Sequence, residues 1–327
     1  MIAALRLCVS APLRFGMDGR ALCLRVFVVQ KGGWVALCFL CASVTLWFFR
    51  RPRFGVSQPL WFNKRFRVFP PVGVQMQFDV LTIFPQLFEP FRTVGVFGKA
   101  VERGVVGVEA HDLRNWADNK WRQLDDEPYG GGAGMVLQAP PVLAAIREMV
   151  AKEDRSRVII LGPRGRLLNQ ELAEELAQEP RLVLVCGRYE GFDERVFEIS
   201  GAEEVSVGDY ILGGGEVAAM ALIETVARLV PGVVGDPASV TCDSFVDGLL
   251  DRPCYTRPPE VEEEPVPEML LSGNHEAIRR WRLERSVELT VTRRPDLVKR
   301  NWGRYSKEIR ELVRRFAPDL APKRGSD

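Results

Sequence analysis

The sequence predicts an α/β fold with a parallel sheet covered by helices on both faces, followed by a smaller, mainly helical C-terminal domain. In residues 76–234, short apolar runs alternate with helical patterns. This alternation is typical of parallel strands, which are buried on both faces and joined by crossover helices. Residues 248–327 have helical patterns and many arginines, and the polar, turn-rich residues 235–247 before them are the expected linker.

The individual strands are predicted from apolar runs that stop at proline or glycine, the residues that most often interrupt regular structure. The expected strands are residues 78–84, 104–110, 157–161, 182–186 and 205–212. Helices are expected at residues 140–152, 170–178 and 216–229, and Asn169 can cap the second of them. In the C-terminal domain, residues 274–285 and 302–316 have helical patterns, whereas residues 286–292 fit a helix or a strand.

Residues 1–75 differ in composition from the rest of the chain. They contain 11 Lys/Arg, a single acidic residue, Asp18, and four of the seven cysteines. An almost wholly apolar run from Trp34 to Phe49 is followed at once by arginines. That is the pattern of a membrane anchor, although the run is slightly short of the roughly 17–25 residues that span a bilayer. The preferred interpretation is spurious translation upstream of a true start at Met76, and on either interpretation the segment lies outside the predicted fold.

The net charge of +1 conceals a strong asymmetry along the chain. Residues 76–275 contain 18 Lys/Arg against 34 Asp/Glu, whereas residues 276–327 contain 15 against 8. A basic segment that follows an acidic domain indicates an anionic partner such as nucleic acid. The cysteines are unpatterned and the chain has only two histidines, His111 and His275. A zinc site is therefore not expected. The cysteine pattern instead favours a reducing, cytoplasmic environment.

Three of the predicted strands end in glycine-bearing segments, near residues 162, 187 and 213. The glycines do not form the G-x-G-x-x-G dinucleotide fingerprint, and no P-loop lysine follows them. The carboxyl ends of parallel strands meet at one edge of the sheet, where ligands bind, so the three segments are expected to be neighbours. Glycine at these positions allows the backbone to approach a ligand closely.

Four longer strings carry a specific resemblance. They begin at Gly187 (GRYEGFDER), Gly208 (GDYILGGGE), Asp243 (DSFVDGLLDRPCYTRP) and Ser272 (SGNHEAIRRWR). In this order they resemble the bacterial tRNA (guanine-N1)-methyltransferase family, and the match extends from Met76 to about Phe316. The resemblance implies a deep trefoil knot in the α/β domain that binds S-adenosylmethionine. It also implies a cytoplasmic homodimer without stable membrane association.

The resemblance further implies the reaction, which is methyl transfer to N1 of the guanosine at tRNA position 37, next to the anticodon. Guanine N1 carries a proton and is a poor nucleophile until a base removes it, and the charge that develops spreads to O6. Asp243 matches the proposed general base of the family. Arg228 matches its partner arginine, which is suited to holding Asp243 or stabilising the charge on O6. Magnesium dependence is implied by the resemblance alone, since no carboxylate cluster in the sequence dictates a metal site.

The same resemblance implies a cofactor site at the three glycine-bearing strand ends. Glu190 is suited to the positive end of the cofactor, and the family often has serine at the position of Gly162. The implied cofactor-binding residues are Leu161, Gly162, Pro163, Gly187, Tyr189, Glu190, Val207, Tyr210, Leu212, Gly214 and Gly215.

The C-terminal domain is expected to bind tRNA, although a charge run is often only a solvated helix face. The candidate phosphate-binding residues are Arg279, Arg280, Arg282 and Arg285, which can share much of one helical face. Three alternatives stay open: a non-catalytic RNA-binding protein that kept the fold, a related knotted methyltransferase acting on another nucleotide, and a membrane-tethered enzyme. The intact predicted catalytic pair and glycine loop disfavour the first, and the C-terminal strings disfavour the second.

Overall fold

The computed structural model describes residues 24–30, 33–39, 76–152, 155–236, 239–240 and 242–322. The chain divides into two compact units, residues 1–66 and 67–327. In the first unit, β1 (Leu24–Gln30) and β2 (Gly33–Phe39) form an antiparallel hairpin. Valine and phenylalanine in these segments favour strand pairing, which was not predicted because the segment shows no clear strand period. Residues 40–49 of the apolar run lie outside the described part of the chain.

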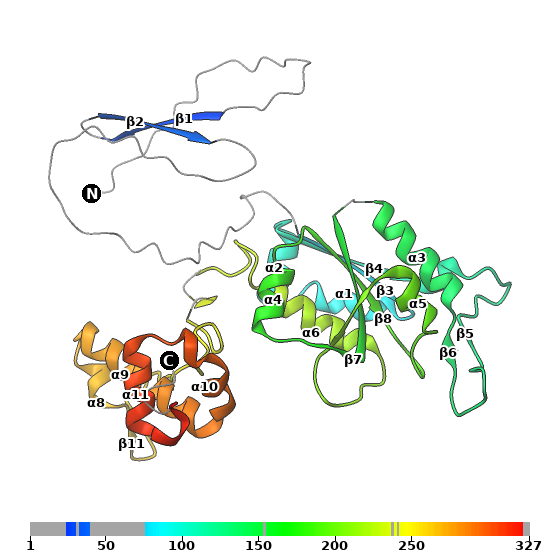
Figure 1. The fold of residues 1–327 in the computed structure, drawn as a ribbon. Coiled ribbons are helices and arrows are strands. Elements are labelled where there is room, and N and C mark those ends of the chain that lie inside the picture. Colours follow the sequence, from blue (N-terminus) through cyan, green and yellow to red (C-terminus); the bar gives the residue numbers. More distant parts are fainter. Residues whose placement is uncertain are drawn as a thin grey trace. The chain divides into compact units, whose positions relative to one another are not determined.

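The second unit is built on a five-stranded, wholly parallel sheet in the order β4–β3–β8–β7–β9 (Figure 1). The strands are β3 (Met76–Thr82), β4 (Val106–Asp112), β7 (Ser156–Leu167), β8 (Arg181–Cys186) and β9 (Glu203–Ser206). Every residue of β8 is buried, as expected for a central strand covered on both faces. The predicted parallel α/β architecture is confirmed.

Helices cover both faces of the sheet, and each face has its own hydrophobic core (Figure 1). The first core contains side chains of α1 (Phe88–Phe91), α2 (Gly95–Glu102), α4 (Gln170–Leu176) and α6 (Gly215–Ala227). The second contains side chains of α3 (Ala139–Ala151) and α5 (Arg195–Ser200). Along β3, Phe78 and Val80 belong to the first core and Leu81 to the second, because successive strand side chains point to opposite faces.

Short elements join these layers. They are the 3-10 helices η1 (Pro85–Leu87) and η2 (Leu113–Trp116) and the two-residue strands β5 (Asp125–Asp126) and β6 (Val136–Leu137). The three predicted helices of this unit, now α3, α4 and α6, are confirmed within two residues at each end. Asn169 caps α4 as predicted, since its side chain accepts a hydrogen bond of 2.9 Å from the backbone N–H of Leu172.

Strand β7 is longer than predicted and is interrupted. Both Leu161 and Arg166 pair with Val205 of β9, so residues 162–165 protrude between two paired segments. The prediction that the strand ends at Gly162 was therefore wrong. The chain returns to the sheet at Gly165, where an added Cβ would lie 2.2 Å from the backbone carbonyl carbon of Glu204. Only glycine permits so close an approach.

Strand β9 is shorter than the predicted strand at residues 205–212. It ends at Ser206, whose Oγ accepts a hydrogen bond from the Gly208 N–H at 3.2 Å and donates one to the Gly208 carbonyl at 3.1 Å. Hydrogen bonds of this local kind close a turn and compete with strand pairing. Residues 207–214 consequently leave the sheet and form a loop at its edge.

The C-terminal part of the second unit is mainly helical. Its elements are β10 (Glu260–Val261), β11 (Glu264–Pro265), α8 (Glu268–Leu271), α9 (His275–Arg293), α10 (Pro295–Asn301), η3 (Trp302–Arg304), α11 (Lys307–Phe316) and η4 (Pro318–Leu320). A third core holds these helices together and includes Val287, Val298 and Trp302. The ambiguous residues 286–292 are helical, because the buried Val287 and Thr290 of α9 share one face of that helix.

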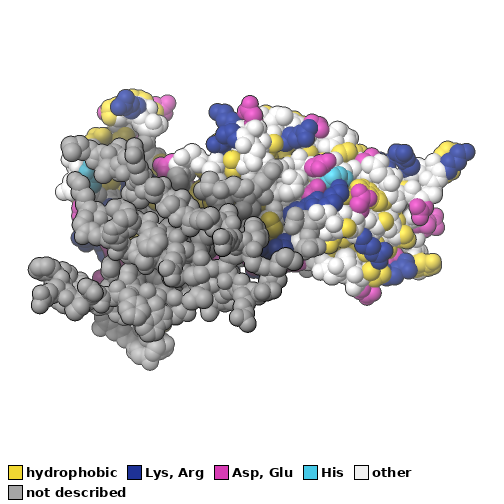
Figure 2. All heavy atoms as spheres, turned by 90° about the horizontal axis from the view of Figure 1, so that it is seen from above, with side chains coloured by type: hydrophobic (Ala, Val, Ile, Leu, Met, Phe, Trp, Pro, Cys, Tyr) yellow, Lys and Arg dark blue, Asp and Glu magenta, His cyan; other side chains and the backbone are white. Residues whose placement is uncertain are grey.

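The described surface carries both signs of charge. On the face seen in Figure 2, Lys and Arg side chains are interspersed with Asp and Glu. An anionic partner on this face would therefore be held by local groups of arginines rather than by a broad basic field. Within the described ranges, no helix is both long enough and apolar enough to cross a bilayer.

Candidate active site

A cavity of about 520 Å³ lies at the carboxyl edge of the sheet. Its walls are the protruding residues of β7 and the loops that follow β8 and β9. Carboxyl ends of neighbouring parallel strands bring such loops together, and small-molecule sites typically have volumes of about 300–1,000 Å³. The expectation that the three glycine-bearing segments are neighbours is confirmed.

All eleven residues implied to bind the cofactor line this one cavity. Leu161, Gly162 and Pro163 come from β7, Gly187, Tyr189 and Glu190 from the loop after β8, Val207, Tyr210, Leu212 and Gly214 from the loop after β9, and Gly215 from α6. Apolar side chains at the rim remain open to solvent, and the side chain of Ile211 is 81% exposed. The structure thus brings the predicted set together, while the ligand itself stays a prediction.

The start of α6 packs directly against the end of β8. The N–H of Gly215 donates a 2.9 Å hydrogen bond to the carbonyl of Gly187. A Cβ at Gly215 would lie 2.8 Å from Cα of Cys186 and 2.9 Å from the backbone nitrogen of Gly187, so backbone meets backbone here. Burial, together with the charge on Glu216, raises the pKa of the Cys186 thiol well above its ordinary value, so this thiol stays protonated near neutral pH.

Gly162 makes room for a carboxylate. A Cβ at this position would lie 2.2 Å from Oε1 of Glu204, and that oxygen accepts a 3.2 Å hydrogen bond from the backbone N–H of Arg164. Glu204 itself lines the cavity. The cavity wall beside Gly162 therefore carries an acidic group that reaches in from β9.

Arg188 was missed by the sequence analysis, although it lies inside one of the recognised strings. Its guanidinium lies 4.6 Å from the ring centre of Phe84, donates a 3.0 Å hydrogen bond to the Gly213 carbonyl, and lies 2.8 Å from Oε2 of Glu216. Glu216 is 1% exposed and accepts a 2.8 Å hydrogen bond from Thr82. A buried ion pair thus ties the glycine loop to the sheet. The sequence signal that could have indicated this pair is Glu216, a charged residue at the start of the largely apolar helix α6.

Arg188 also retains donor capacity toward the cavity that it lines. Its Nε is buried and has no hydrogen-bond acceptor among the described residues. Buried polar atoms are usually paired, so an orphaned donor at the wall of a cavity is an expected feature of a site that receives a polar ligand or water.

Arg228 and Asp243, predicted as a catalytic pair, are brought together by the structure. Arg228 Nη2 lies 2.5 Å from Asp243 Oδ2, and the side chains are 47% and 41% exposed. Arg228 is the residue at the C-terminal end of α6. The pair lines a separate cavity of about 340 Å³, to which Gln170 and Ser244 also contribute. The carboxylate is thus oriented by a cation and remains accessible to a large substrate.

Helix α6 separates this pair from the first cavity. Gly215 at the start of α6 lines the 520 Å³ cavity, and Arg228 follows its last residue. With 13 residues in the helix and 1.5 Å of rise per residue, about 20 Å lies between the two ends. The two cavities share no lining residue. Group transfer requires the reacting atoms to be about 3–3.5 Å apart, so one chain alone does not bring the pair to the first cavity.

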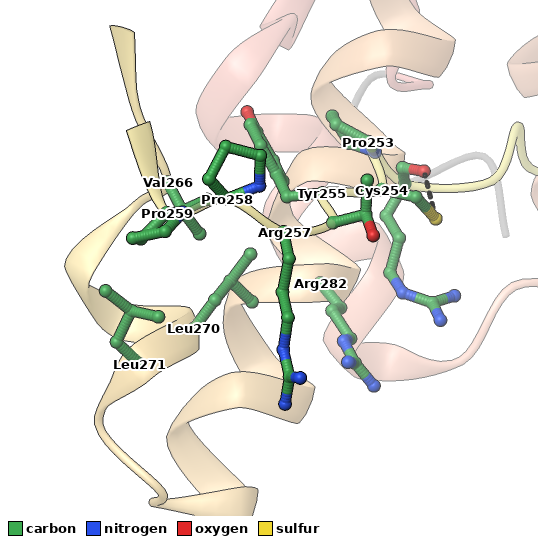
Figure 3. A pocket seen from close by; sticks show the side chains of 12 residues that line it. Pro253, Cys254, Tyr255, Arg257, Pro258, Pro259, Val266, Leu270, Leu271 and Arg282 are labelled. Carbon is green, nitrogen blue, oxygen red and sulfur yellow. Dashed lines mark hydrogen bonds between the residues drawn. The ribbon is translucent and has the colours of Figure 1, made fainter. Parts of the chain in front are cut away.

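A third cavity, of about 1040 Å³, lies in the helical part of the chain (Figure 3). It is lined by residues 252–259, by Val266, by the end of α8 and by Arg282 of α9. None of its residues was predicted as part of a cavity, although Arg282 was a candidate RNA contact. Its combination of apolar and cationic side chains differs from both other cavities.

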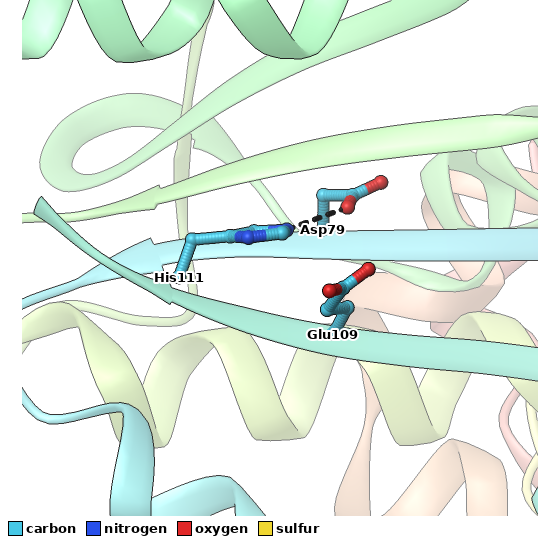
Figure 4. Close-up of side chains that lie close together, drawn as sticks. All are labelled: Asp79, Glu109 and His111. Carbon is cyan, nitrogen blue, oxygen red and sulfur yellow. Dashed lines mark hydrogen bonds and ion pairs between the residues drawn. The ribbon is translucent and has the colours of Figure 1, made fainter. Parts of the chain in front are cut away.

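Asp79, Glu109 and His111 form the cluster of potential metal ligands found among the described residues (Figure 4). Their ligand atoms lie within 4.8 Å of one another. However, His111 Nε2 is 2.8 Å from one oxygen of Asp79, and Arg181 donates a 2.7 Å hydrogen bond to the other. Burial would raise the pKa of Asp79, but these two partners outweigh it and hold that pKa below its ordinary value. Asp79 is thus already balanced by Arg181, whose positive charge opposes the binding of a metal cation at this cluster.

These features define the class of α/β proteins that bind a small molecule at the carboxyl edge of a parallel sheet. Sequence comparison identifies the family within that class. The family tRNA (Guanine-1)-methyltransferase TrmD matches residues 76–300. The chain belongs to this family, and the resemblance stated above is confirmed.

Curated relatives agree with this assignment. A tRNA (guanine-N(1)-)-methyltransferase of Geobacter sp. (strain M21) is 46% identical over 235 residues, which are 72% of this chain and 94% of the relative. Proteins with the same description from Rhodopirellula baltica and Frankia alni are 50% and 52% identical. These two matches each cover 68% of this chain, and 94% and 85% of the respective relatives.

Proposed function

We propose that this chain is a tRNA methyltransferase that transfers a methyl group from S-adenosylmethionine to N1 of the guanosine at tRNA position 37, in the cytoplasm. The observation that carries the proposal is the 2.5 Å pair of Arg228 and Asp243 in a chain of this family. The family match begins at Met76, which supports placing the enzyme after residue 75, and we assign catalysis to residues 76–234 and RNA binding to residues 248–327.

S-adenosylmethionine suits the residues of the 520 Å³ cavity. Gly187, Gly213 and Gly214 line the cavity without side chains, so the backbone there can approach an adenine ring closely. The carboxylates of Glu190 and Glu204 line the same cavity and suit the positive end of the molecule. The eleven cavity residues named above would hold it. When bound, it supplies an electrophilic methyl group.

Asp243 and Arg228 supply the proton chemistry in this proposal. The Asp243 carboxylate would take the proton from guanine N1, which frees the electron pair of N1 to accept the methyl group that the bound cofactor would supply, with the cofactor sulfur as the leaving group. Arg228 orients the carboxylate, and its remaining N–H donors suit the charge that spreads to guanine O6. Since both side chains are nearly half exposed, a nucleotide of a folded RNA can reach them.

We further propose that the working enzyme is a homodimer. Arg228 follows the last residue of α6, whereas Gly215 and Ala218 near its start line the cavity, so about 15 Å of helix lies between the pair and the nearest lining residue of α6. A second copy that contributes its Arg228 and Asp243 to the first copy's cavity would complete the site. In a two-fold symmetric dimer the exchange is reciprocal, so two complete sites form. The exposed apolar rim at Ile211 is suited to such a contact.

The proposal includes a trefoil knot around the cavity. Support comes from the tight passage of the residues before α6 against the end of β8, where Gly215 touches the backbone of Cys186. Support also comes from the protruding segment of β7 on the adjacent strand. Chain segments that cross so closely are what a knotted ligand site requires.

The first test uses the full chain with labelled S-adenosylmethionine and an unmodified tRNA transcript. Methyl transfer is expected to a transcript with guanosine at position 37 and not to a matched transcript with adenosine there. A chelator is expected to reduce the rate, and added magnesium to restore it, since tRNA phosphates can carry the ion without a protein ligand set. Equal transfer to both transcripts would move the target to another nucleotide, and a chelator without effect would remove magnesium from the proposal.

The dimer is tested by complementation. Gly215→Val is expected to abolish cofactor binding, because the added atoms meet the backbone of Cys186. Asp243→Ala removes the base. Each variant alone should be inactive. After unfolding and co-refolding at equal amounts, about half the dimers are mixed and each has one intact site of two, so about a quarter of wild-type activity should return. No recovery in mixtures whose mixed dimers are verified by mass would show that one chain supplies both parts.

A further inference from the structure

The cavity in the helical part of the chain has a cationic side and an apolar side. In Figure 3, Arg257 and Arg282 extend in the same direction, and Leu270 and Leu271 lie to one side of them. At about 1040 Å³, the space is large enough for a nucleotide. An apolar side next to a cationic side is suited to a ligand that has a flat apolar part and an anionic part.

Most of the arginines predicted to bind RNA are already neutralised by glutamates. The ion pairs on α9 are Arg279–Glu276 at 3.0 Å, Arg280–Glu284 at 3.5 Å and Arg285–Glu288 at 2.5 Å. Arg282 is the exception among the four. Within the described ranges, neither Arg282 nor Arg257 forms an ion pair or a hydrogen bond with another side chain. Both of these arginines line this cavity, together with Arg252, which is paired with Asp251 at 2.8 Å.

The apolar side of the cavity is unusually open. The side chain of Leu271 is 64% exposed, and that of Tyr255 is 49% exposed, with its ring centre 6.4 Å from that of Trp281. Neither side chain belongs to the core of the helical part. Exposed apolar surface beside unpaired cations indicates a binding surface rather than a packing fault.

We propose that this cavity is a nucleotide-binding subsite for a non-duplex segment of the RNA substrate, an inference that rests on the proposed function. The guanidinium groups of Arg257 and Arg282 hold one phosphate, because their fixed N–H forks match phosphate oxygens. The adjoining base or ribose packs on Tyr255 and Leu271. Unstacked bases of loops are recognised in this way, by stacking on flat side chains beside backbone cations.

The test measures affinity for an unmodified tRNA transcript at several salt concentrations, using the full chain. Arg257→Ala combined with Arg282→Ala should weaken binding about tenfold or more and lower the salt slope by about 1 to 2. Leu271→Ala should weaken binding several-fold without changing the slope, because it removes a wall and no charge. The matched control is Lys307→Ala combined with Arg315→Ala. It removes the same charge from exposed side chains that have glutamates at 3.8 Å and 3.5 Å, and it should stay within about twofold.

Cofactor affinity of each variant is measured in parallel and should equal that of the wild type. If the double variant binds tRNA with wild-type affinity and slope while the wild type methylates normally, the subsite is wrong and the proposed function stands. If the control weakens binding as much as the double variant, the effect is one of general charge and the subsite is again wrong. A wild type that neither binds nor methylates tRNA overturns both proposals.

Discussion

Replacing Asp243 with alanine is expected to reduce methyl transfer by roughly 100- to 10,000-fold, the range over which a positioned general base contributes. Guanine N1 then keeps its proton as the methyl group approaches, and Arg228, 2.5 Å away in the wild type, has no carboxylate to orient. Single-turnover rates with saturating cofactor and tRNA measure the effect directly. Asp243→Asn should be equally slow, because the amide keeps the shape of the side chain but cannot accept the proton.

The control for this prediction is Asp247→Ala. Asp247 lies four residues further along and is exposed, so its removal should change the rate by less than about twofold. Affinity for S-adenosylmethionine should be unchanged in all three variants, since neither Asp243 nor Asp247 is among the cavity residues proposed to hold it. A rate for Asp243→Ala within tenfold of the wild type would exclude this carboxylate as the base while leaving the enzyme family intact.

Replacing Asp79 with asparagine is expected to have the largest effect on stability. Asp79 is 1% exposed and bonds to Arg181, whose side chain is only 10% exposed. Removing one partner of a buried pair leaves an uncompensated charge, and this costs about 3 kcal/mol. Hydrogen exchange of the β3 and β8 amides should accelerate roughly 100-fold. The amides of α9 serve as an internal reference, because that helix packs in a separate core.

Glu109→Gln is the matched control, because Glu109 belongs to the same cluster but is exposed. It should change the exchange of these amides by less than about threefold.

The contacts of Asp79 with His111 and Arg181 also predict that the stability of the fold depends on pH in the acid range. The folded pKa of Asp79 lies below 3.8, so its stabilisation is present above about pH 4 and is lost as the pH falls through the folded pKa. In Asp79→Asn this part of the loss of stability at low pH should be absent. The same dependence of stability on pH in the variant and the wild type would contradict the prediction.

Secondary structure was predictable from the sequence where a segment carries its own local signal, such as an apolar run or a helix cap. Strand β8 reads as a continuous apolar run, and α4 carries its own cap at Asn169. The residues that line the 520 Å³ cavity were named through the resemblance, and a parallel sheet brings such loops to one edge. The missed helices α1, α2, α5, α8 and α10 are short, with at most eight residues each, and so they carry little periodic signal.

The features that the sequence did not predict depend on tertiary contacts or on turns that compete with the apolar pattern. The contact of Arg188 with Glu216 joins the loop after β8 to the first turn of α6, and neither residue alone indicates an ion pair. The end of β9 was predicted too late because the Ser206 turn competes with the apolar pattern that follows it. Likewise, only the folded helix shows that Arg282 lacks the glutamate partner that its neighbours have. The domain boundaries and residues 1–75 as a spurious extension remain predictions.

Val205 of β9 pairs twice with β7, with Leu161 before the protruding segment and with Arg166 after it. The segment that lines the cavity is therefore separate from the residues that hold the two strands together. Gly162, Pro163 and Arg164 line the cavity, yet they take no part in the pairing of β7 with β9. An insertion or deletion there alters the shape of the wall and leaves the strand register intact, whereas the same change one residue into either flank inverts every side chain beyond it. Evolution and protein engineering can therefore vary what this edge of the sheet recognises without redesigning the sheet.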